Sequence, residues 1–364
     1  MPSFDEAPMD LSPTHLLLLG DTKAGKTDYV MKAAEAGINV LWIDGDVAAT
    51  TLQKLTPAAK KRVFYLPVHD YVNERGQYVS AFAEFIVAFT TQGRFLWNDT
   101  LCKPFDRKTY ESGEGGHVVW EIIPSRMDST SLCAIDSWTR LVSSLVNWKA
   151  EDLGVDLLEI EKLERDLYTG TGHKATQFLK LITGLKCHVA VIGHPREYIK
   201  KSAPKGSRGQ VPEKDMKIDW IQMVPVSTSN PHALTMGASF SDIGWIDVSA
   251  TGNRTIDFKP SDSRVIGGNN NIKEPVDDFP MSKLLEKNMG GKINPAGAPT
   301  DGWLTRYEAG AYEPAGGLAK PAIVLGAKPA APTIQTSATA PQLIAPKPSG
   351  LGNLLNLKPG GVQR

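Results

Sequence analysis

Eight residues near the start of the chain have the types and spacing of a phosphate-binding loop. They read glycine, four residues, then Gly-Lys-Thr, and they lie between a short apolar run and a helical pattern. Glycines let the backbone wrap around a phosphate with its N–H groups pointing inward, and a helix that begins there adds the positive end of its dipole. A Gly-rich turn without a ligand is the alternative. The residues expected to bind a nucleotide are Gly20, Asp21, Thr22, Lys23, Ala24, Gly25, Lys26 and Thr27.

Side chains of this loop and of a later strand are expected to hold a metal ion and the terminal phosphates. Lys26 can reach the β- and γ-phosphates, and the Thr27 hydroxyl can bind Mg²⁺. Asp136 ends the apolar run 132–135, a pattern typical of a carboxylate that holds the water shell of the metal. Taken alone, such an aspartate would be interpreted as a cap of the following helix. The phosphate loop favours the metal role, so ATP and Mg²⁺ are the predicted ligands.

Two further polar side chains follow apolar strand patterns, at the edge where parallel sheets bind ligands. Asp46 follows the run 39–43 and could orient the water that attacks the γ-phosphate, whereas Asp44 is better suited to hold the turn. Two solvated turn aspartates are the alternative. His194 follows the run 189–192 and could sense the γ-phosphate, although a lone histidine is usually structural. The expected catalytic residues are Lys26, Asp46, Asp136 and His194.

Short apolar runs alternate with helical patterns over the first two hundred residues. Continuous apolar strands separated by helices predict an α/β fold, with a mostly parallel central sheet covered by helices on both faces. The expected strands are 14–19, 39–43, 62–66, 131–135 and 188–192, and the expected helices are 26–35, 78–91, 153–167 and 174–185.

Later segments break this alternation. The strand-like runs 220–226, 243–248 and 255–259 predict an antiparallel extension at the sheet edge, and 95–124 is interpreted as a hairpin insertion. The predicted organisation is an N-terminal lead at 1–13, one nucleotide-binding domain at 14–275, a linker at 276–317 and a tail at 318–364.

The predicted tail differs from the rest of the chain in composition. It holds five basic and no acidic residues, whereas the 364-residue chain balances 40 basic against 40 acidic residues. Its Ala, Pro and Gly content predicts disorder, because such a segment buries too little apolar surface to offset the entropy of ordering. The apolar cluster 351–357 could dock on a protein partner, or the tail could serve only solubility.

Composition also argues against several classes of protein. Hydrophobic residues make up 41% of the chain, which is enough for a sizeable core, yet no run approaches the ~20 apolar residues that span a bilayer. Acidic residues near the N-terminus disfavour a signal peptide. Three widely spaced cysteines form neither a disulfide framework nor a metal pattern. A cytoplasmic protein without membrane contact is expected.

Four motifs follow one another along the chain: the phosphate loop 20–27 and the strand ends 43–46, 135–137 and 193–194. In type and order they resemble the motifs of RecA-type ATPases. More narrowly, the chain resembles short RecA-like nucleotide-binding proteins of bacteriophages, some of which assist single-strand annealing and recombination. The resemblance covers about 14–264 and implies a RecA-like P-loop NTPase fold. Asp46 stands where RecA-type proteins carry a glutamate base, which implies slow hydrolysis. RecA ends its sensor strand with glutamine, and His194 fits the phage group better.

The resemblance also implies partners. RecA-type proteins contact DNA through loops after the sensor strand, and here the segment 200–217 carries six basic and two acidic residues. Such a loop could neutralise phosphates of single-stranded DNA, or it could simply be solvated. RecA-type neighbours in a homo-oligomer often supply a cation to the γ-phosphate. The candidate DNA-binding residues are Lys200, Lys201, Lys205 and Arg208, and the candidates for the cation supplied in trans are Lys259 and Arg264.

The sequence therefore predicts an ATP-binding and ATP-hydrolysing protein that acts on single-stranded DNA in phage-type recombination, annealing or replication. One alternative is a P-loop kinase for a small molecule, whose lid would have to come from 95–124, where Arg107 lies near Lys103 and Lys108. The other is a scaffold that binds nucleotide without turnover and contacts partners through its tail.

Overall fold

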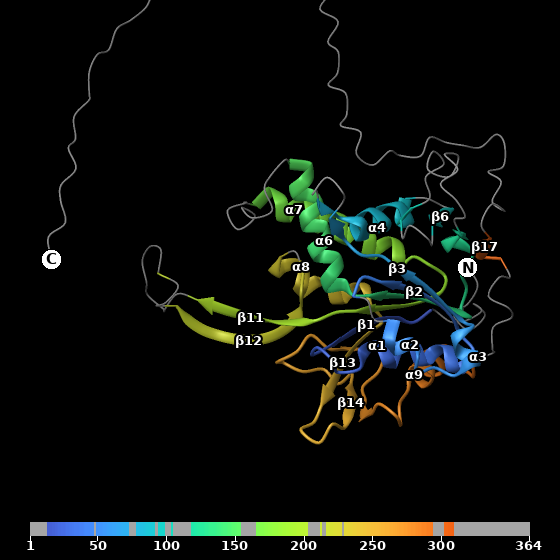
Figure 1. The fold of residues 1–364 in the computed structure, drawn as a ribbon. Coiled ribbons are helices and arrows are strands. Elements are labelled where there is room, and N and C mark those ends of the chain that lie inside the picture. The colour runs from blue at the N-terminus through green and yellow to red at the C-terminus, as the bar shows by residue number, and fades with distance from the viewer. Residues whose placement is uncertain are drawn as a thin grey trace, which may run out of the picture. The chain divides into compact units, whose positions relative to one another are not determined.

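The structure of the chain is a computed structural model (Figure 1). It describes residues 13–46, 49–72, 78–91, 94–98, 103–104, 118–153, 165–202, 212, 216–227, 229–293 and 302–308. All of these lie in one compact unit, Met1–Lys320. The predicted tail lies outside the described residues. No helix among the described residues is long and apolar enough to span a membrane.

A large, mostly parallel sheet forms the centre of the fold, as the sequence predicts. Its strand order is β16-β14-β13-β1-β10-β9-β2-β3, and the neighbours from β13 to β3 all run parallel. The five predicted strands agree with the observed bounds to within about a residue at either end. The parallel strands are β1 (His15–Gly20), β2 (Asn39–Asp44), β3 (Val63–Pro67), β9 (Ser131–Asp136), β10 (His188–Ile192) and β13 (Asp242–Val248).

The register of these strands brings their carboxyl ends to one edge of the sheet. Asp44 pairs with Asp136, and Asp136 pairs in turn with Ile192. The chain crosses from β1 over β10 and β9 to reach β2, and it later returns across β1 to reach β13. Such a reversal of strand order opens a crevice at the carboxyl ends, which is where open α/β sheets bind ligands.

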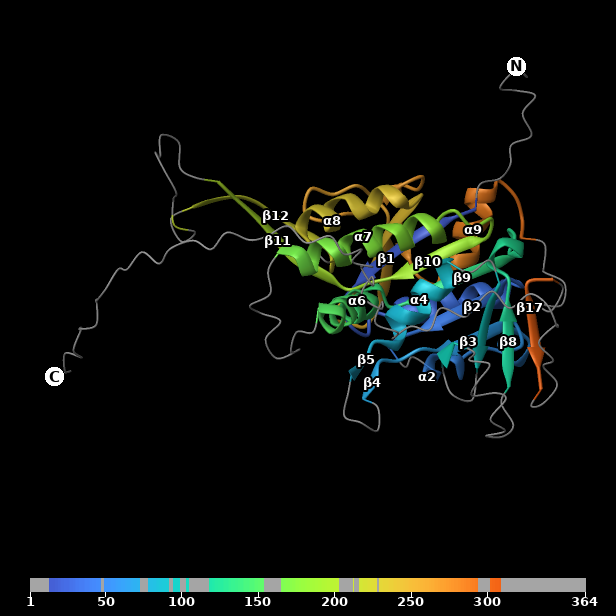
Figure 2. The ribbon, with the colours of Figure 1, turned by 90° about the horizontal axis from the view of Figure 1, so that it is seen from above.

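Helices cover both faces of the sheet (Figures 1 and 2). Successive side chains of a strand point to opposite faces, so Leu17 and Leu19 pack in one core and Leu16 and Leu18 in the other. Each such leucine contributes about 1.5–3 kcal/mol on burial. The first core contains α4 (Ala81–Thr91), α6 (Trp138–Leu153) and α7 (Arg165–Ile182), and the second contains α1 (Lys26–Met31), η1 (Lys32–Ala36), α3 (Pro57–Lys60) and α9 (Met281–Met289).

Antiparallel strands extend the sheet beyond β13, but only one of the three runs predicted for this extension, 255–259, lies in it. The run 243–248 falls in β13, which pairs parallel with β1, and the run 220–226 lies in a separate two-stranded sheet. β14 (Arg254–Asp257) pairs with β13, and β16 (Lys273–Pro275) pairs with β14. The short β15 (Gly267–Gly268) also pairs with β13. This extension brings Arg254 close to the phosphate-loop side of β1.

The predicted insertion forms strands, but it does not stand alone. β6 (Phe95–Asn98) pairs antiparallel with β8 (Val119–Ile122) and with β7 (Lys103–Pro104). β17 (Leu304–Tyr307) adds to β8 from almost two hundred residues further along the chain (Figure 2). This small sheet packs on the core that holds α4, through buried side chains such as Trp97 and Leu304.

The segment 276–317, predicted as a linker, contains α9 as well as β17. Met281, Leu284 and Leu285 of α9 have the i, i+3, i+4 spacing of an amphipathic helix, and all three are fully buried in the second core. The helix is only nine residues long and lies among Gly, Pro and Asn residues, so the sequence pattern indicated a linker instead.

Helix boundaries shift more than strand boundaries. α4 begins at Ala81 rather than at 78, because Tyr78 and Val79 form β5 (Tyr78–Val79) and pair with β4 (Tyr71–Val72). α7 begins at Arg165, nine residues before the predicted start. The predicted helical stripe 153–167 falls largely on 154–164, outside the described residues.

Candidate nucleotide-binding site

The loop between β1 and α1 has the backbone geometry of an anion-binding turn. Gly20 and Gly25 take positive φ angles of 149° and 91°, which favour glycine. A Cβ on Gly20 would lie 2.6 Å from the carbonyl oxygen of Ile246, so only glycine fits there. Lys23 also has a positive φ, 65°, and is the one described non-glycine residue that does. Such strain in a loop is typical of a functional site.

The amino group of Lys26 is held at the mouth of this turn. Its Nζ donates to the carbonyl oxygens of Gly20 and Asp21, at 2.8 Å each. Burial lowers the pKa of Lys26, and the Asp136 carboxylate opposes that shift. These two carbonyl contacts are ones that an anion in the loop could replace with a stronger charge-assisted bond.

Thr27 and Asp136 meet across the ends of two strands. The Oγ1 hydroxyl of Thr27 donates to Oδ2 of Asp136 at 2.6 Å. Two hard oxygen donors so close together suit Mg²⁺, which binds one or two protein oxygens and keeps phosphate oxygens and water as its other ligands. No cluster of three or more His, Cys, Asp or Glu side chains that could hold a metal occurs in the described part of the chain. A protein cage for a metal is therefore not what these residues form.

Asp136 sits in a strongly perturbed environment. Burial raises its pKa to about 7, the bond from Thr27 opposes this, and the carboxylates of Asp44 and Asp46 raise it further. The pKa is raised because a buried carboxylate with few hydrogen-bond partners is costly to ionise. A cation next to Thr27 would relieve that cost.

The other two aspartates have different partners. Asp44 accepts from the backbone N–H of Asp46 at 2.8 Å and from the Tyr65 hydroxyl at 2.7 Å, so it holds the turn after β2. The Asp46 carboxylate instead accepts from Nε of Arg140 at 2.8 Å. Of these two aspartates, Asp46 is the one that lines the pocket.

His194 follows β10 and lies beside the same pocket. Its backbone N–H donates to Oγ1 of Thr139 at 3.0 Å, which ties the end of β10 to the first turn of α6. Burial lowers the pKa of His194, and the positive charge of Lys26 lowers it further. The imidazole is accordingly held in its neutral form near neutral pH.

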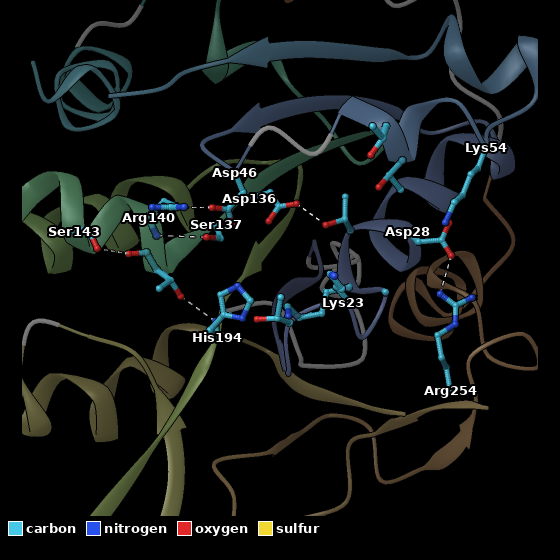
Figure 3. Close-up of a pocket in the computed structure, with 17 residues that line it drawn as sticks. Lys23, Asp28, Asp46, Lys54, Asp136, Ser137, Arg140, Ser143, His194 and Arg254 are labelled. Atoms are coloured by element: carbon cyan, nitrogen blue, oxygen red, sulfur yellow. Dashed lines mark hydrogen bonds and ion pairs between the residues drawn. The ribbon is translucent and has the colours of Figure 1, made fainter. Parts of the chain in front are cut away.

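These groups line one pocket of about 810 Å³ (Figure 3). The structure brings together all four residues predicted as catalytic, although Lys200, Lys201, Lys259 and Arg264 lie outside the lining. Five lining side chains are basic and three are acidic, so the pocket favours an anion. The lining residues are Thr22, Lys23, Gly25, Lys26, Thr27, Asp28, Asp46, Thr50, Thr51, Lys54, Asp136, Ser137, Thr139, Arg140, Ser143, His194 and Arg254.

Sequence reasoning missed the pocket's arginines. Arg254 comes from β14, pairs with Asp28 at 2.9 Å and packs over Gly25. Arg264, one of the two cations predicted to act in trans, is instead bound to Asp247 by two hydrogen bonds and lies over the ring of Trp245. A turn between two strands with an arginine at its end was the available signal for Arg254.

The predicted DNA-binding segment begins as an ordered ribbon rather than as an irregular loop. β11 (Pro195–Ser202) and β12 (Lys217–Pro225) pair antiparallel and extend away from the helices (Figure 1). Lys200 is exposed and Lys201 is half-buried on β11. The other two predicted residues, Lys205 and Arg208, lie outside the described residues.

Comparisons with known proteins add little. No family model matches the chain, and no curated protein matches it. The crystal structure of the RadB recombinase is similar to this chain at 15% sequence identity and a TM-score of 0.31, over 68% of this chain and 80% of that one. Similarity at that level assigns neither a family nor a function.

Proposed function

We propose that this chain is a RecA-type ATPase that binds ATP with Mg²⁺, hydrolyses it slowly, and acts on single-stranded DNA in phage-type recombination, annealing or replication. The observation that carries the proposal is the 2.6 Å contact between Thr27 and Asp136 beside a glycine turn that holds Lys26. The groups to which the proposal assigns phosphate and metal binding lie together at the carboxyl edge of a parallel sheet.

Each lining group has a role in this proposal. The backbone N–H groups of the loop and Lys26 bind the phosphates, while Thr27 and Asp136 supply oxygens to Mg²⁺. The bound ion would neutralise charge on the phosphate oxygens. Asp46 orients the attacking water, and His194 contacts the terminal phosphate through its neutral ring. Hydrolysis is slow because the Asp46 side chain is one methylene shorter than a glutamate.

The ribbon supports the DNA part of the proposal. β11 starts at Pro195, the residue after His194, so a change at the pocket acts directly on the start of the ribbon. Lys200 and Lys201 lie further along the same strand and are the proposed phosphate contacts. In a homo-oligomer, Lys259 is the better candidate for a cation supplied in trans, because Arg264 is bound to Asp247 within its own chain.

The kinase alternative has less support. None of the described residues of 95–124 lines the pocket, so they provide no lid and no acceptor site next to the phosphate loop. The nucleotide-gated scaffold remains an outcome of the test rather than a second proposal.

ATP turnover with and without single-stranded DNA, at two salt concentrations, tests the proposal. The expected result is slow turnover that DNA stimulates more strongly at low salt, since phosphate contacts weaken as salt rises. The Lys26→Ala variant is the control and is expected to lose turnover. Turnover only with a small acceptor would contradict the proposal in favour of a kinase, and binding without turnover would favour a scaffold.

A further inference from the structure

Arg140 is a pocket cation to which the proposed function gives no role. It lies on the first turn of α6, four residues after Asp136. Its Nε donates to Asp46, and its two Nη groups make no hydrogen bond with any described residue. The guanidinium therefore points unused donors into the space beside the carboxylate that orients water.

The pair between Arg140 and Asp46 is easily exchanged. The Arg140 side chain is 67% exposed and the Asp46 side chain 25% exposed. Exposed ion pairs contribute little to stability, so breaking this one costs little. A terminal phosphate offers more negative charge and more acceptor oxygens than one carboxylate, and a planar guanidinium binds such a group with two parallel bonds.

Arg140 also lies at the end of the pocket where a terminal phosphate belongs. Figure 3 shows Arg140, Asp46, Asp136 and His194 together on one side, with Arg254 and Asp28 on the other. Lys26, Arg140 and His194 all line this one pocket.

Resting on the proposed function, we infer that Arg140 binds the γ-phosphate within its own chain and exchanges Asp46 for it. In the free protein the guanidinium holds Asp46. When ATP is bound, the guanidinium moves to the γ-phosphate, and the Asp46 carboxylate is released to orient water. No covalent bond or proton changes place in this step. ADP has no γ-phosphate, so the ion pair stays closed, and Arg140 makes the site prefer ATP.

Dissociation constants for ATPγS and for ADP, each with Mg²⁺, test this inference on the full chain. The Arg140→Gln variant is expected to lower the preference for ATPγS over ADP by about tenfold to a hundredfold, with ADP affinity nearly unchanged. The matched control is Arg254→Gln, which removes the same charge from the opposite end of the pocket and should change both affinities by a similar factor. Thermal unfolding of both variants checks that they fold.

The Asp46→Asn variant separates the two states of Arg140. It frees the guanidinium, so the preference for ATPγS should equal or exceed that of the unaltered chain while turnover is lost. An unchanged preference in Arg140→Gln, or an equal loss in Arg254→Gln, would overturn the inference. Failure of the proposed function itself looks different: the unaltered chain would bind neither nucleotide, or Lys26→Ala would bind ATPγS equally well.

Discussion

Three aspartates at or just after the ends of two neighbouring strands have different roles because they have different partners. The Asp44 carboxylate accepts hydrogen bonds from a backbone N–H and from the Tyr65 hydroxyl, and the Asp46 carboxylate accepts one from Arg140. The Asp136 carboxylate accepts one from the Thr27 hydroxyl. Asp136 is almost fully buried, and of the three it is the least satisfied as an anion. That combination makes Asp136 the carboxylate with most to gain from a metal ion.

Replacing Asp136 should therefore remove the effect of Mg²⁺ on ATP binding. We expect Asp136→Asn to lose about tenfold to a hundredfold in affinity for ATP with Mg²⁺ present, and little without it. Titrations with and without Mg²⁺ measure this. Asp46→Asn is the control and should keep its metal dependence; a metal effect that survives in Asp136→Asn would contradict the assignment.

His188 gives the folded chain a pH dependence unrelated to the pocket. Its ring is fully buried, its Nδ1 accepts from the Thr14 N–H at 3.0 Å, and burial lowers its pKa to about 4. Below the ordinary histidine pKa of about 6.5, His188 is protonated in the unfolded chain but stays neutral in the folded chain. Stability should therefore fall by about 3 kcal/mol as the pH drops from about 6.5 to about 4.

Urea unfolding of the unaltered chain and of His188→Asn, at pH 7 and pH 4.5, isolates this group from the others that titrate. The asparagine keeps an acceptor for Thr14 but takes up no proton, so its loss of stability should be smaller. Equal losses in the two proteins would refute the assignment.

Residues of the phosphate loop, and Asp136, could be found from the sequence because each lies in a local pattern next to an apolar strand. Arg140 and Arg254 could not, because nothing in their neighbours reveals their partners. Arg254 binds Asp28 across 226 residues, and Arg140 binds Asp46 across 94. Only the strand order of the sheet makes these pairs neighbours.

Among the larger elements, buried strands were the most predictable, since a parallel strand covered on both faces is a continuous apolar run. α9 was not predicted because nine residues with three buried apolar positions give a weak pattern. β17 was not predicted because its partner, β8, lies far away in the sequence.

The packing of α9 gives a direct test that this helix belongs to the folded domain. Leu284→Ala should lower the free energy of unfolding by about 2–5 kcal/mol, because Leu284 is fully buried against the second core. Leu181→Ala, on α7 and 46% exposed, is the matched control and should change it by less than about 0.5 kcal/mol. Denaturant unfolding measures both, and equal small effects would show that the helix is dispensable.

The ribbon of β11 and β12 is the element that the proposal assigns to DNA. Replacing both Lys200 and Lys201 by glutamine should weaken binding of single-stranded DNA and reduce the slope of log affinity against log salt by about 1.4, since each lost phosphate contact removes about 0.7. Fluorescence anisotropy at several salt concentrations measures it. The control pair is Lys32→Gln with Lys283→Gln, which lie away from the ribbon on η1 and α9. An equal effect of both pairs would contradict the assignment.

Basic and acidic side chains are unevenly distributed within a chain that is neutral as a whole. The 364 residues carry no formal net charge, yet the pocket lining holds five basic and three acidic side chains. A neutral chain gives little general attraction for polyanions, so the proposed nucleotide binding rests on the local charge of this pocket. Composition alone hides this distribution, because it appears only once the sheet brings β1, β2, β9, β10 and β14 together.

Equilibrium binding of ATPγS with Mg²⁺ to the unaltered chain and to Lys26→Ala tests the central claim most directly. Lys32→Ala is the control, because Lys32 is half-buried, pairs with Asp277 and lies outside the pocket. The account predicts saturable binding that Lys26→Ala weakens at least tenfold, by loss of a charge-assisted bond, and that Lys32→Ala leaves unchanged. Binding of equal strength in all three proteins, or in none, would contradict it.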